Sequence, residues 1–257
     1  MRLAGALAKR PSNRHLPNCS VENNKNDQIR RLCGAIFFCF LCIVVGTAQD
    51  PQPQRYRPSS ISVQQLQLSP RTRKSLLKAQ RLFHQANFDG ALAELNSSLH
   101  ADPACALTWT QRALVHLAKN NLGAAVTDAT HATSLDAYNA QAFLALATAQ
   151  NSAHDYERAE SAARRALFLA PDLWQARLEI AKSLYGRQLF SFALQQLDTL
   201  QMDFADVHLV RGDTLMKLGL QSQGTTELQK FLEEAPRDPR CAQLRQIVAL
   251  LPGHQGF

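Results

Sequence analysis

Apolar residues in the body of the chain recur at the spacing of an α-helix. In residues 156–169, YERAESAARRALFL, small and apolar side chains return every three or four residues, and charged residues fill the positions between them. A helix with 3.6 residues per turn places such side chains on one face. Residues 140–151 consist almost entirely of strong helix formers. No stretch shows the alternation that is typical of a strand, so the pattern predicts an all-α protein.

Small residues mark a repeat across the same region. They come in pairs whose members are 12 residues apart, and successive pairs begin after 34, 34, 34 and 31 residues. The pairs are Ala79 and Ala91, Ala113 and Ala125, Ala147 and Ala159, Ala181 and Ala193, and Gly212 and Gly224. A period near 34 predicts units of two antiparallel helices that cross at the small residues. One unit cannot bury its apolar face alone, so neighbouring units should stack around a continuous core.

With these residues the sequence resembles the tetratricopeptide repeat family. Trp109 and Phe143 occupy the family's aromatic site in the first helix, and Pro103, Pro171 and Pro236 follow the second helix of their units. Three units depart from the aromatic site, at Ser75, Arg177 and His208. The resemblance implies a right-handed superhelical solenoid of about five helix-turn-helix units with a C-terminal capping helix.

The repeat sets the expected boundaries of the domain. The solenoid should span 71–251 and be followed by a tail at 252–257. Its units are 72–105, 106–139, 140–173, 174–204 and 205–238, and the capping helix is 239–251. The fourth unit is three residues short, which puts the end of its second helix in question. Asp238 followed by Pro239 is typical of a helix start, which favours a cap there.

The first 48 residues have the parts of an export signal. Arg30 and Arg31 precede an uncharged apolar run at 32–45, and Gly46-Thr47-Ala48 supplies small residues for cleavage. A membrane-spanning helix needs about 20 apolar residues, more than this run provides. We therefore expect a periplasmic or secreted protein cleaved near Ala48. The alternatives are an anchor retained in the inner membrane, with a membrane tether through 32–48 and the solenoid outside, and a buried helix of a cytosolic domain.

A basic segment joins this leader to the repeat. Residues 49–70 are rich in Pro, Gln and Ser, which predicts a linker. From Pro51 to Phe88 there are seven Lys or Arg residues and no acid. Two interpretations stay open, contact with an anionic surface such as membrane headgroups and an ordinary solvated helix face, of which the second is favoured.

Charge and cysteine content exclude some classes of function. The net charge is +7, but residues 82–257 hold 14 bases and 18 acids, a balance of −4. We therefore expect no nucleic-acid partner. Cys105 and Cys241 should lie about four units apart, too far for a disulfide bond.

No catalytic motif is recognisable in the sequence. The signatures of metalloproteases, α/β-hydrolases and nucleotide-binding loops are absent, and the histidines follow no ligand spacing. We predict no catalytic residue, no metal site, no cofactor and no enzymatic activity.

The resemblance instead implies a concave groove lined by the first helix of each unit. The candidate residues for holding a partner come from all five units: Gln80, His84, Thr110, Gln141, Thr148, Asn151, Lys182, Tyr185, Asp213 and Lys217. The Lys, Arg and Asn cluster with which some members bind acidic C-terminal tails is missing. The sequence therefore predicts a non-enzymatic scaffold, exported, that holds a peptide or protein partner. The alternative is a membrane-anchored assembly or structural factor of the cell envelope.

Overall fold

The computed structural model describes residues 68–200 and 204–250. Within these ranges every regular element is a helix. The predictions for the leader, for the apolar run at 32–45, for most of the linker and for the tail lie outside the described residues. No helix in the described ranges is both long enough and apolar enough to cross a membrane.

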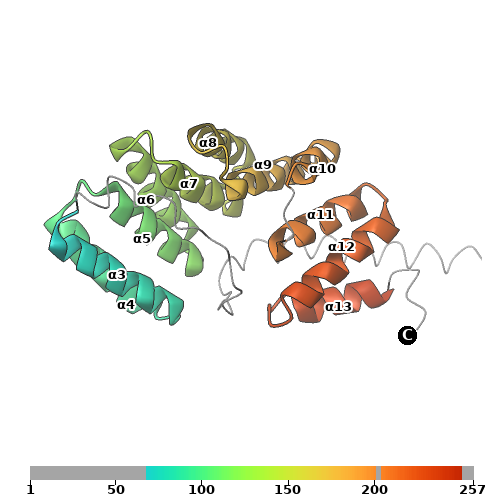
Figure 1. Ribbon diagram of the computed structural model, residues 1–257, viewed down its shortest axis with the longest axis horizontal. Helices are drawn as coiled ribbons and strands as arrows, with labels where there is room; N and C mark the ends of the chain where they lie inside the picture. Colours follow the sequence, from blue (N-terminus) through green and yellow to red (C-terminus); the bar gives the residue numbers. More distant parts are fainter. Residues whose placement is uncertain (1–67, 201–203, 251–257) are drawn as a thin grey trace, which may run out of the picture.

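The helices follow one another as antiparallel pairs along the long axis of the molecule (Figure 1). They are α3 (Pro70–His84), α4 (Phe88–Ala101), α5 (Ala106–Ala118), α6 (Leu122–Leu135), α7 (Ala140–Ser152), α8 (Tyr156–Leu169), α9 (Trp174–Gly186), α10 (Phe190–Asp198), α11 (Ala205–Lys217), α12 (Gln221–Glu234) and α13 (Cys241–Leu250). Each pair packs on the next, and α13 packs on α12 at the end. The prediction of an all-α helical solenoid is confirmed.

Each pair turns through the same three-residue connection. Its middle residue has a left-handed backbone, with φ between 56° and 81°, in every unit: Ala86, Asn120, His154, Gln188 and Gly219. These residues are spaced 34, 34, 34 and 31 apart, as the small-residue pairs are. Only the last turn uses glycine, the residue that adopts this backbone without strain. The first four turns hold their shape because the two helices they join are packed together.

The helix crossings are closed by the small residues that define the repeat. Ala91, Ala113, Ala147 and Ala181 are fully buried. In the last unit the crossing is tighter, since a Cβ atom added to Gly224 would lie 2.9 Å from the carbonyl oxygen of Gly212. Small side chains let two helix backbones approach, and the apolar core follows these crossings from one unit to the next.

The fourth unit is shortened at its second helix. Helix α10 has 9 residues, whereas α4, α6, α8 and α12 have 14 each. The rings of Trp174 and Phe204 stack with their centroids 4.3 Å apart, so the start of α9 contacts the residue before α11. Leu178, Leu197 and Val207 form a core cluster beside this stack. Aromatic and aliphatic packing thus joins α11 to α9 despite the missing turns of α10.

Ion pairs link the two helices of three units at equivalent positions, which the sequence analysis did not anticipate. The partners are 16 residues apart in each case: Lys78 and Glu94 at 2.6 Å, Arg112 and Asp128 at 2.7 Å, and Arg211 and Glu227 at 3.5 Å. In the third and fourth units, the positions equivalent to Arg112 are occupied by the apolar residues Leu146 and Ile180, respectively. The same place in the fold is therefore filled either by a charge pair or by an apolar residue.

Candidate functional site

The first helices of successive units form one wall of the molecule. Helix α5 packs against α7, α7 against α9 and α9 against α11, whereas successive second helices make few such contacts. A stack in which the helices of one side are more closely spaced than those of the other side curves toward the closely spaced side. The first helices therefore line the inner side of the curve, as the resemblance implied.

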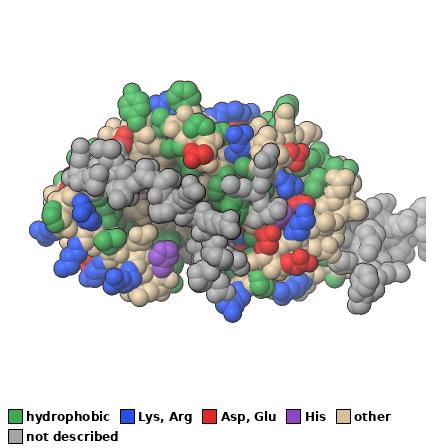
Figure 2. All heavy atoms as spheres, viewed as in Figure 1, with side chains coloured by type: hydrophobic (Ala, Val, Ile, Leu, Met, Phe, Trp, Pro, Cys, Tyr) green, Lys and Arg blue, Asp and Glu red, His purple; other side chains and the backbone are tan. Residues whose placement is uncertain are grey.

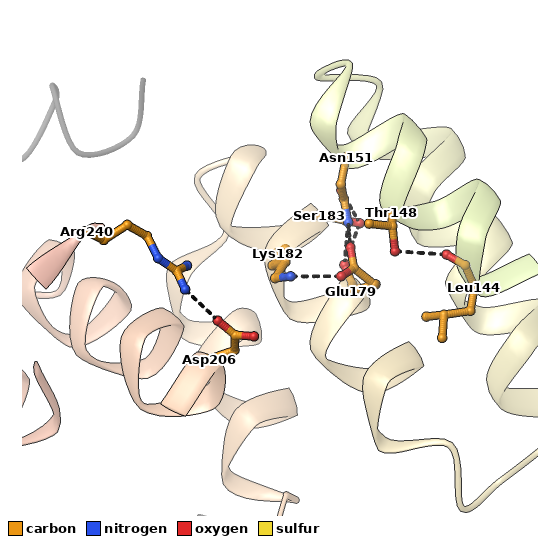
Figure 3. Close-up of polar contacts among 8 residues, drawn as sticks. All are labelled: Leu144, Thr148, Asn151, Glu179, Lys182, Ser183, Asp206 and Arg240. Atoms are coloured by element: carbon orange, nitrogen blue, oxygen red, sulfur yellow. Dashed lines mark hydrogen bonds and ion pairs between the residues drawn. The ribbon is translucent and has the colours of Figure 1, made fainter. Parts of the chain in front are cut away.

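A polar network joins α7 to α9 on this inner side (Figure 3). The Nδ2 atom of Asn151 donates to the backbone oxygen of Glu179 at 2.9 Å and to its Oε2 atom at 2.8 Å. The hydroxyl oxygen of Ser183 lies 2.8 Å from Oδ1 of Asn151. All three side chains are buried. Because each polar atom in this network has a partner, the network fixes the register of α7 against α9.

Charged groups of alternating sign continue from this network toward α13 (Figure 3). Nζ of Lys182 contacts Oε1 of Glu179 at 2.8 Å, and the guanidinium of Arg240 contacts Asp206 at 3.0 Å. Burial alone would lower the pKa of Lys182, but the charges of Glu179 and Asp206 outweigh it and raise that pKa. Lys182 is therefore a fixed cation. Side chains of alternating charge follow one another from α9 to the start of α13: Glu179, Lys182, Asp206 and Arg240.

A second polar contact joins α9 to α11. The hydroxyl of Tyr185 acts on the carboxyl group of Asp213, and both side chains are buried. Burial raises the pKa of Asp213 to about 6, although the Tyr185 hydroxyl and the nearby Lys217 act to lower it. The ring of Tyr185 also packs edge-on against Phe190, with the centroids 5.3 Å apart.

The structure places the ten predicted groove residues in three different environments. Gln80, His84 and Gln141 are exposed, and Thr148, Lys182 and Lys217 are partly buried. Thr110, Asn151, Tyr185 and Asp213 are buried. Thr148, Asn151 and Lys182 lie near one another in Figure 3, and Tyr185 meets Asp213, whereas Gln80 and His84 lie at the far end on α3.

Two of the predicted residues use their hydroxyl groups within their own helix. Thr110 donates to the carbonyl of Ala106 at 2.9 Å, and Thr148 donates to that of Leu144 at 3.0 Å. The assignment of the ten residues to partner binding stays a prediction. Among the candidates on α7, α9 and α11, the side chains that remain at least partly exposed are those of Gln141, Thr148, Lys182 and Lys217.

Sequence reasoning missed four residues that shape this wall. Glu179 and Ser183 flank Lys182 on α9, Asp206 opens α11, and Arg240 precedes α13. The candidates chosen from the sequence on α9 were Lys182 and Tyr185, so the adjacent Glu179 and Ser183 were left out. Arg240 gave no signal at all, because it comes from outside the five repeats and reaches Asp206 only through the tertiary fold.

Another buried cluster lies away from this wall, between α11 and α12. His208 stands where the second and third units carry an aromatic residue. Its Nδ1 atom lies 2.7 Å from Glu227, and its Nε2 atom lies 3.3 Å from Glu234. Burial would raise the pKa of Glu227, but hydrogen bonds from His208 and Lys230 outweigh it and lower that pKa. This cluster joins the two helices of the unit. Across 68–200 and 204–250, no group of three or more His, Cys, Asp or Glu side chains has the arrangement of a metal site.

Comparison with known proteins supports the fold only. No protein-family model and no curated protein matches the chain. A thermophilic tetratricopeptide repeat protein of Thermus thermophilus superposes with a TM-score of 0.60 at 17% identity, covering 69% of this chain and 97% of that one. A tetratricopeptide repeat protein from Parabacteroides merdae also gives 0.60, at 14% identity, covering 69% and 70%. The MamA protein gives 0.51 at 18% identity, covering 66% and 94%. The chain therefore has the fold of tetratricopeptide repeat proteins.

Proposed function

We propose that the chain is a non-enzymatic scaffold that holds an extended peptide or a protein segment along the inner wall of its solenoid. The binding segment is the stretch from α7 to α11, with Gln141, Thr148, Lys182 and Lys217 as the contacting side chains. Amide, hydroxyl and ammonium groups bind the backbone carbonyls and the polar side chains of an extended chain.

One observation carries this proposal. Helices α7 and α9 place neutral polar and charged side chains on one wall, where Asn151, Glu179 and Ser183 form a network that is internally complete. Because Asn151, Glu179 and Ser183 satisfy one another, the wall is rigid before a partner arrives. A rigid site loses less conformational entropy on binding than a site that must be ordered first.

Selection of peptides from a random library displayed on phage would test the groove. The full chain is the bait, and the binding of each selected peptide is measured by calorimetry. The groove variant combines Gln141→Ala, Thr148→Tyr and Lys217→Ala, which remove two polar contacts and place a ring in the wall. We expect this variant to bind the selected peptides with an affinity at least about ten-fold lower, which is a loss of about 1.4 kcal/mol of binding free energy.

A matched variant on the second helices controls for general effects of substitution. Ser161→Tyr, Gln195→Ala and Ser222→Ala likewise introduce one ring and remove two polar side chains, at three exposed positions. This control should bind the peptides as the unaltered chain does. Equal binding by the groove variant, or the failure of any peptide to be enriched, would show that the inner wall is not a peptide site.

We also propose that the solenoid works outside the cytoplasm. The support comes from the sequence alone: the basic pair Arg30-Arg31, the apolar run at 32–45 and the small residues before Gln49. N-terminal sequencing of the protein recovered from its native cells tests this. A mature chain that begins at Gln49 supports export and cleavage, and a chain that keeps 32–48 in the membrane fraction supports the anchored alternative. Recovery of the uncleaved chain from the cytosol would contradict both.

A further inference from the structure

Helix α3 carries a concentration of positive charge that the proposed groove does not use. Its 15 residues include five Lys or Arg and no acid. These bases are Arg71, Arg73, Lys74, Lys78 and Arg81. In the space-filling view, Lys and Arg side chains gather at the lower left, where α3 lies, with few acidic groups among them (Figure 2). The described residues after this helix, in contrast, contain more acids than bases.

Four of these bases lie in one stripe of the helix. Arg71, Lys74, Lys78 and Arg81 follow one another at intervals of three, four and three residues, the spacing that keeps side chains on one helix face. The opposite face is the packed one, where Thr72 and Ala79 are buried. The cationic stripe therefore points away from the core.

Most of this charge is not neutralised within the described residues. Lys78 pairs with Glu94 at 2.6 Å. For Arg71, Lys74 and Arg81, no ion pair is present among the residues that the structure describes, and all three side chains are exposed. A row of unneutralised charges on a rigid helix attracts an anionic partner over about one Debye length, roughly 10 Å.

An apolar side chain lies within the same face. Leu77 is 60% exposed and sits one helical turn from Lys74 and from Arg81. An exposed leucine ringed by bases matches the interface of a bilayer, where charged headgroups overlie hydrocarbon. A nucleic-acid backbone offers no apolar layer to such a side chain.

We propose that this face of α3 binds the anionic headgroups of a lipid bilayer, with Leu77 entering the interface. Two further features of the sequence support this occupant. Residues 82–257 carry a net charge of −4, so an anionic surface attracts this end of the molecule and repels the rest. The apolar run ends at Val45, and the 24 residues at 46–69 that separate it from α3 can span at most about 80 Å, a distance over which both segments can reach one surface. The proposal is independent of the groove.

Vesicle binding by the full chain tests this surface. Sedimentation of the chain is measured with neutral vesicles of phosphatidylcholine and with anionic vesicles of phosphatidylcholine plus phosphatidylglycerol. The affinity for the anionic vesicles is divided by the affinity for the neutral ones, because this ratio cancels the contribution of any insertion by the apolar run. Each Lys or Arg near an anionic surface contributes about five-fold to affinity. The variant Arg71→Gln, Lys74→Gln and Arg81→Gln should therefore lower the ratio by about a hundred-fold, and added salt should lower it for the unaltered chain.

Two further variants separate this surface from nonspecific charge effects. Arg158→Gln, Arg237→Gln and Arg245→Gln remove the same number of exposed charges from other helices and turns, and this control should keep the ratio of the unaltered chain. Leu77→Ser should weaken binding to the anionic vesicles while the dependence on salt stays the same. Far-ultraviolet circular dichroism verifies that each variant keeps its helices.

Three results would overturn the proposal. The first is equal affinity of the unaltered chain for both kinds of vesicle. The second is an unchanged ratio in the α3 variant. The third is tighter binding, at equal phosphate concentration, to a single-stranded oligonucleotide than to the anionic vesicles, which would assign the stripe to nucleic acid.

Discussion

Buried charged residues show how the fold alters the chemistry of single side chains. Asp128 is only 3% exposed, yet Arg112 contacts it with two nitrogen atoms, each at 2.7 Å. Asp213 is 6% exposed, and its pKa is raised to about 6 because burial disfavours the charged form. The first carboxylate has a cation beside it, whereas the second depends mainly on a neutral hydroxyl. Removing the partner of Asp128 should therefore destabilise the protein, whereas removing the charge of Asp213 should stabilise it.

The raised pKa of Asp213 predicts a stability that falls as pH rises. The folded state holds a proton on this group up to about pH 6, while the unfolded chain releases it near the ordinary pKa of 3.8. Between these values the folded state binds more protons, so the free energy of unfolding decreases with pH, by up to about 3 kcal/mol. Asp213→Asn should therefore stabilise the protein at pH 7 and have little effect at pH 4, as measured by urea unfolding. A difference between the two proteins that is the same at both pH values would refute this.

The pair of Arg112 and Asp128 predicts a rescue by a second substitution. Arg112→Leu leaves a buried carboxylate without its cation and should cost about 3 kcal/mol. Adding Asp128→Ala recreates the combination of Leu146 and Ala162 in the third unit, so most of the loss should return. Lys78→Leu is the control, because Lys78 is 58% exposed and its pair with Glu94 should contribute less than about 1 kcal/mol. Denaturant unfolding of the unaltered chain and the three variants gives these values. A double variant no more stable than Arg112→Leu would show that an apolar pair cannot replace the charge pair at this position.

At the scale of the element, the turns and crossings repeat more faithfully than the sequence does. Four of the five turns place a non-glycine residue in the left-handed backbone. The crossings use alanine in four units and a glycine pair between α11 and α12. Glycine is needed there because the backbone oxygen of Gly212 occupies the space that a Cβ atom on Gly224 would take. The geometry of the unit is therefore kept by close packing, and the residue type varies with the local clearance.

Gly123 and Gly224, which lie in the first turns of α6 and α12, should respond differently to alanine. Alanine is favoured over glycine within a helix by up to about 1 kcal/mol. Gly123→Ala on α6 should stabilise the protein, because nothing lies within 4 Å of the added Cβ atom. Gly224→Ala should instead destabilise it by about 1–3 kcal/mol, because the backbone of α11 must move. Thermal unfolding measures both, and a raised melting temperature for Gly224→Ala would mean that α11 and α12 are less closely packed.

At the scale of the whole molecule, the stack depends on contacts between neighbouring units. Each pair packs on the next, and α11 reaches α9 through a core cluster and the ring stack of Trp174 on Phe204. In such a stack a local defect weakens the units beside it more than distant ones. Because α10 is short, the stack of Trp174 on Phe204 supplies part of the contact between α9 and the start of α11.

Trp174→Ala should therefore lower stability unevenly along the chain. Loss of the stack should cost about 2–4 kcal/mol. Hydrogen exchange should become faster in α9 to α13, while α3 to α6 keep the protection of the unaltered protein. Trp109→Ala is the matched control, and its effect should be largest in α4 to α6, since the indole donates to Pro103 and packs against His131. Equal loss of protection in every helix after either substitution would show that the stack unfolds as one cooperative unit.

The sequence by itself determined the helical class, the period and the shortened fourth unit. These follow from the chain because a helix face and a crossing require apolar and small residues at fixed intervals, whatever lies elsewhere. Only the tertiary structure decided which polar residues of the first helices remain accessible. Asn151 and Asp213 fit the pattern of a groove stripe, but the neighbouring helix supplies Glu179 to one and Tyr185 to the other, so both are buried. Arg240 joins the wall from 34 residues away in the chain. Burial and pairing depend on residues distant in sequence, and the spacing within one helix carries no information about them.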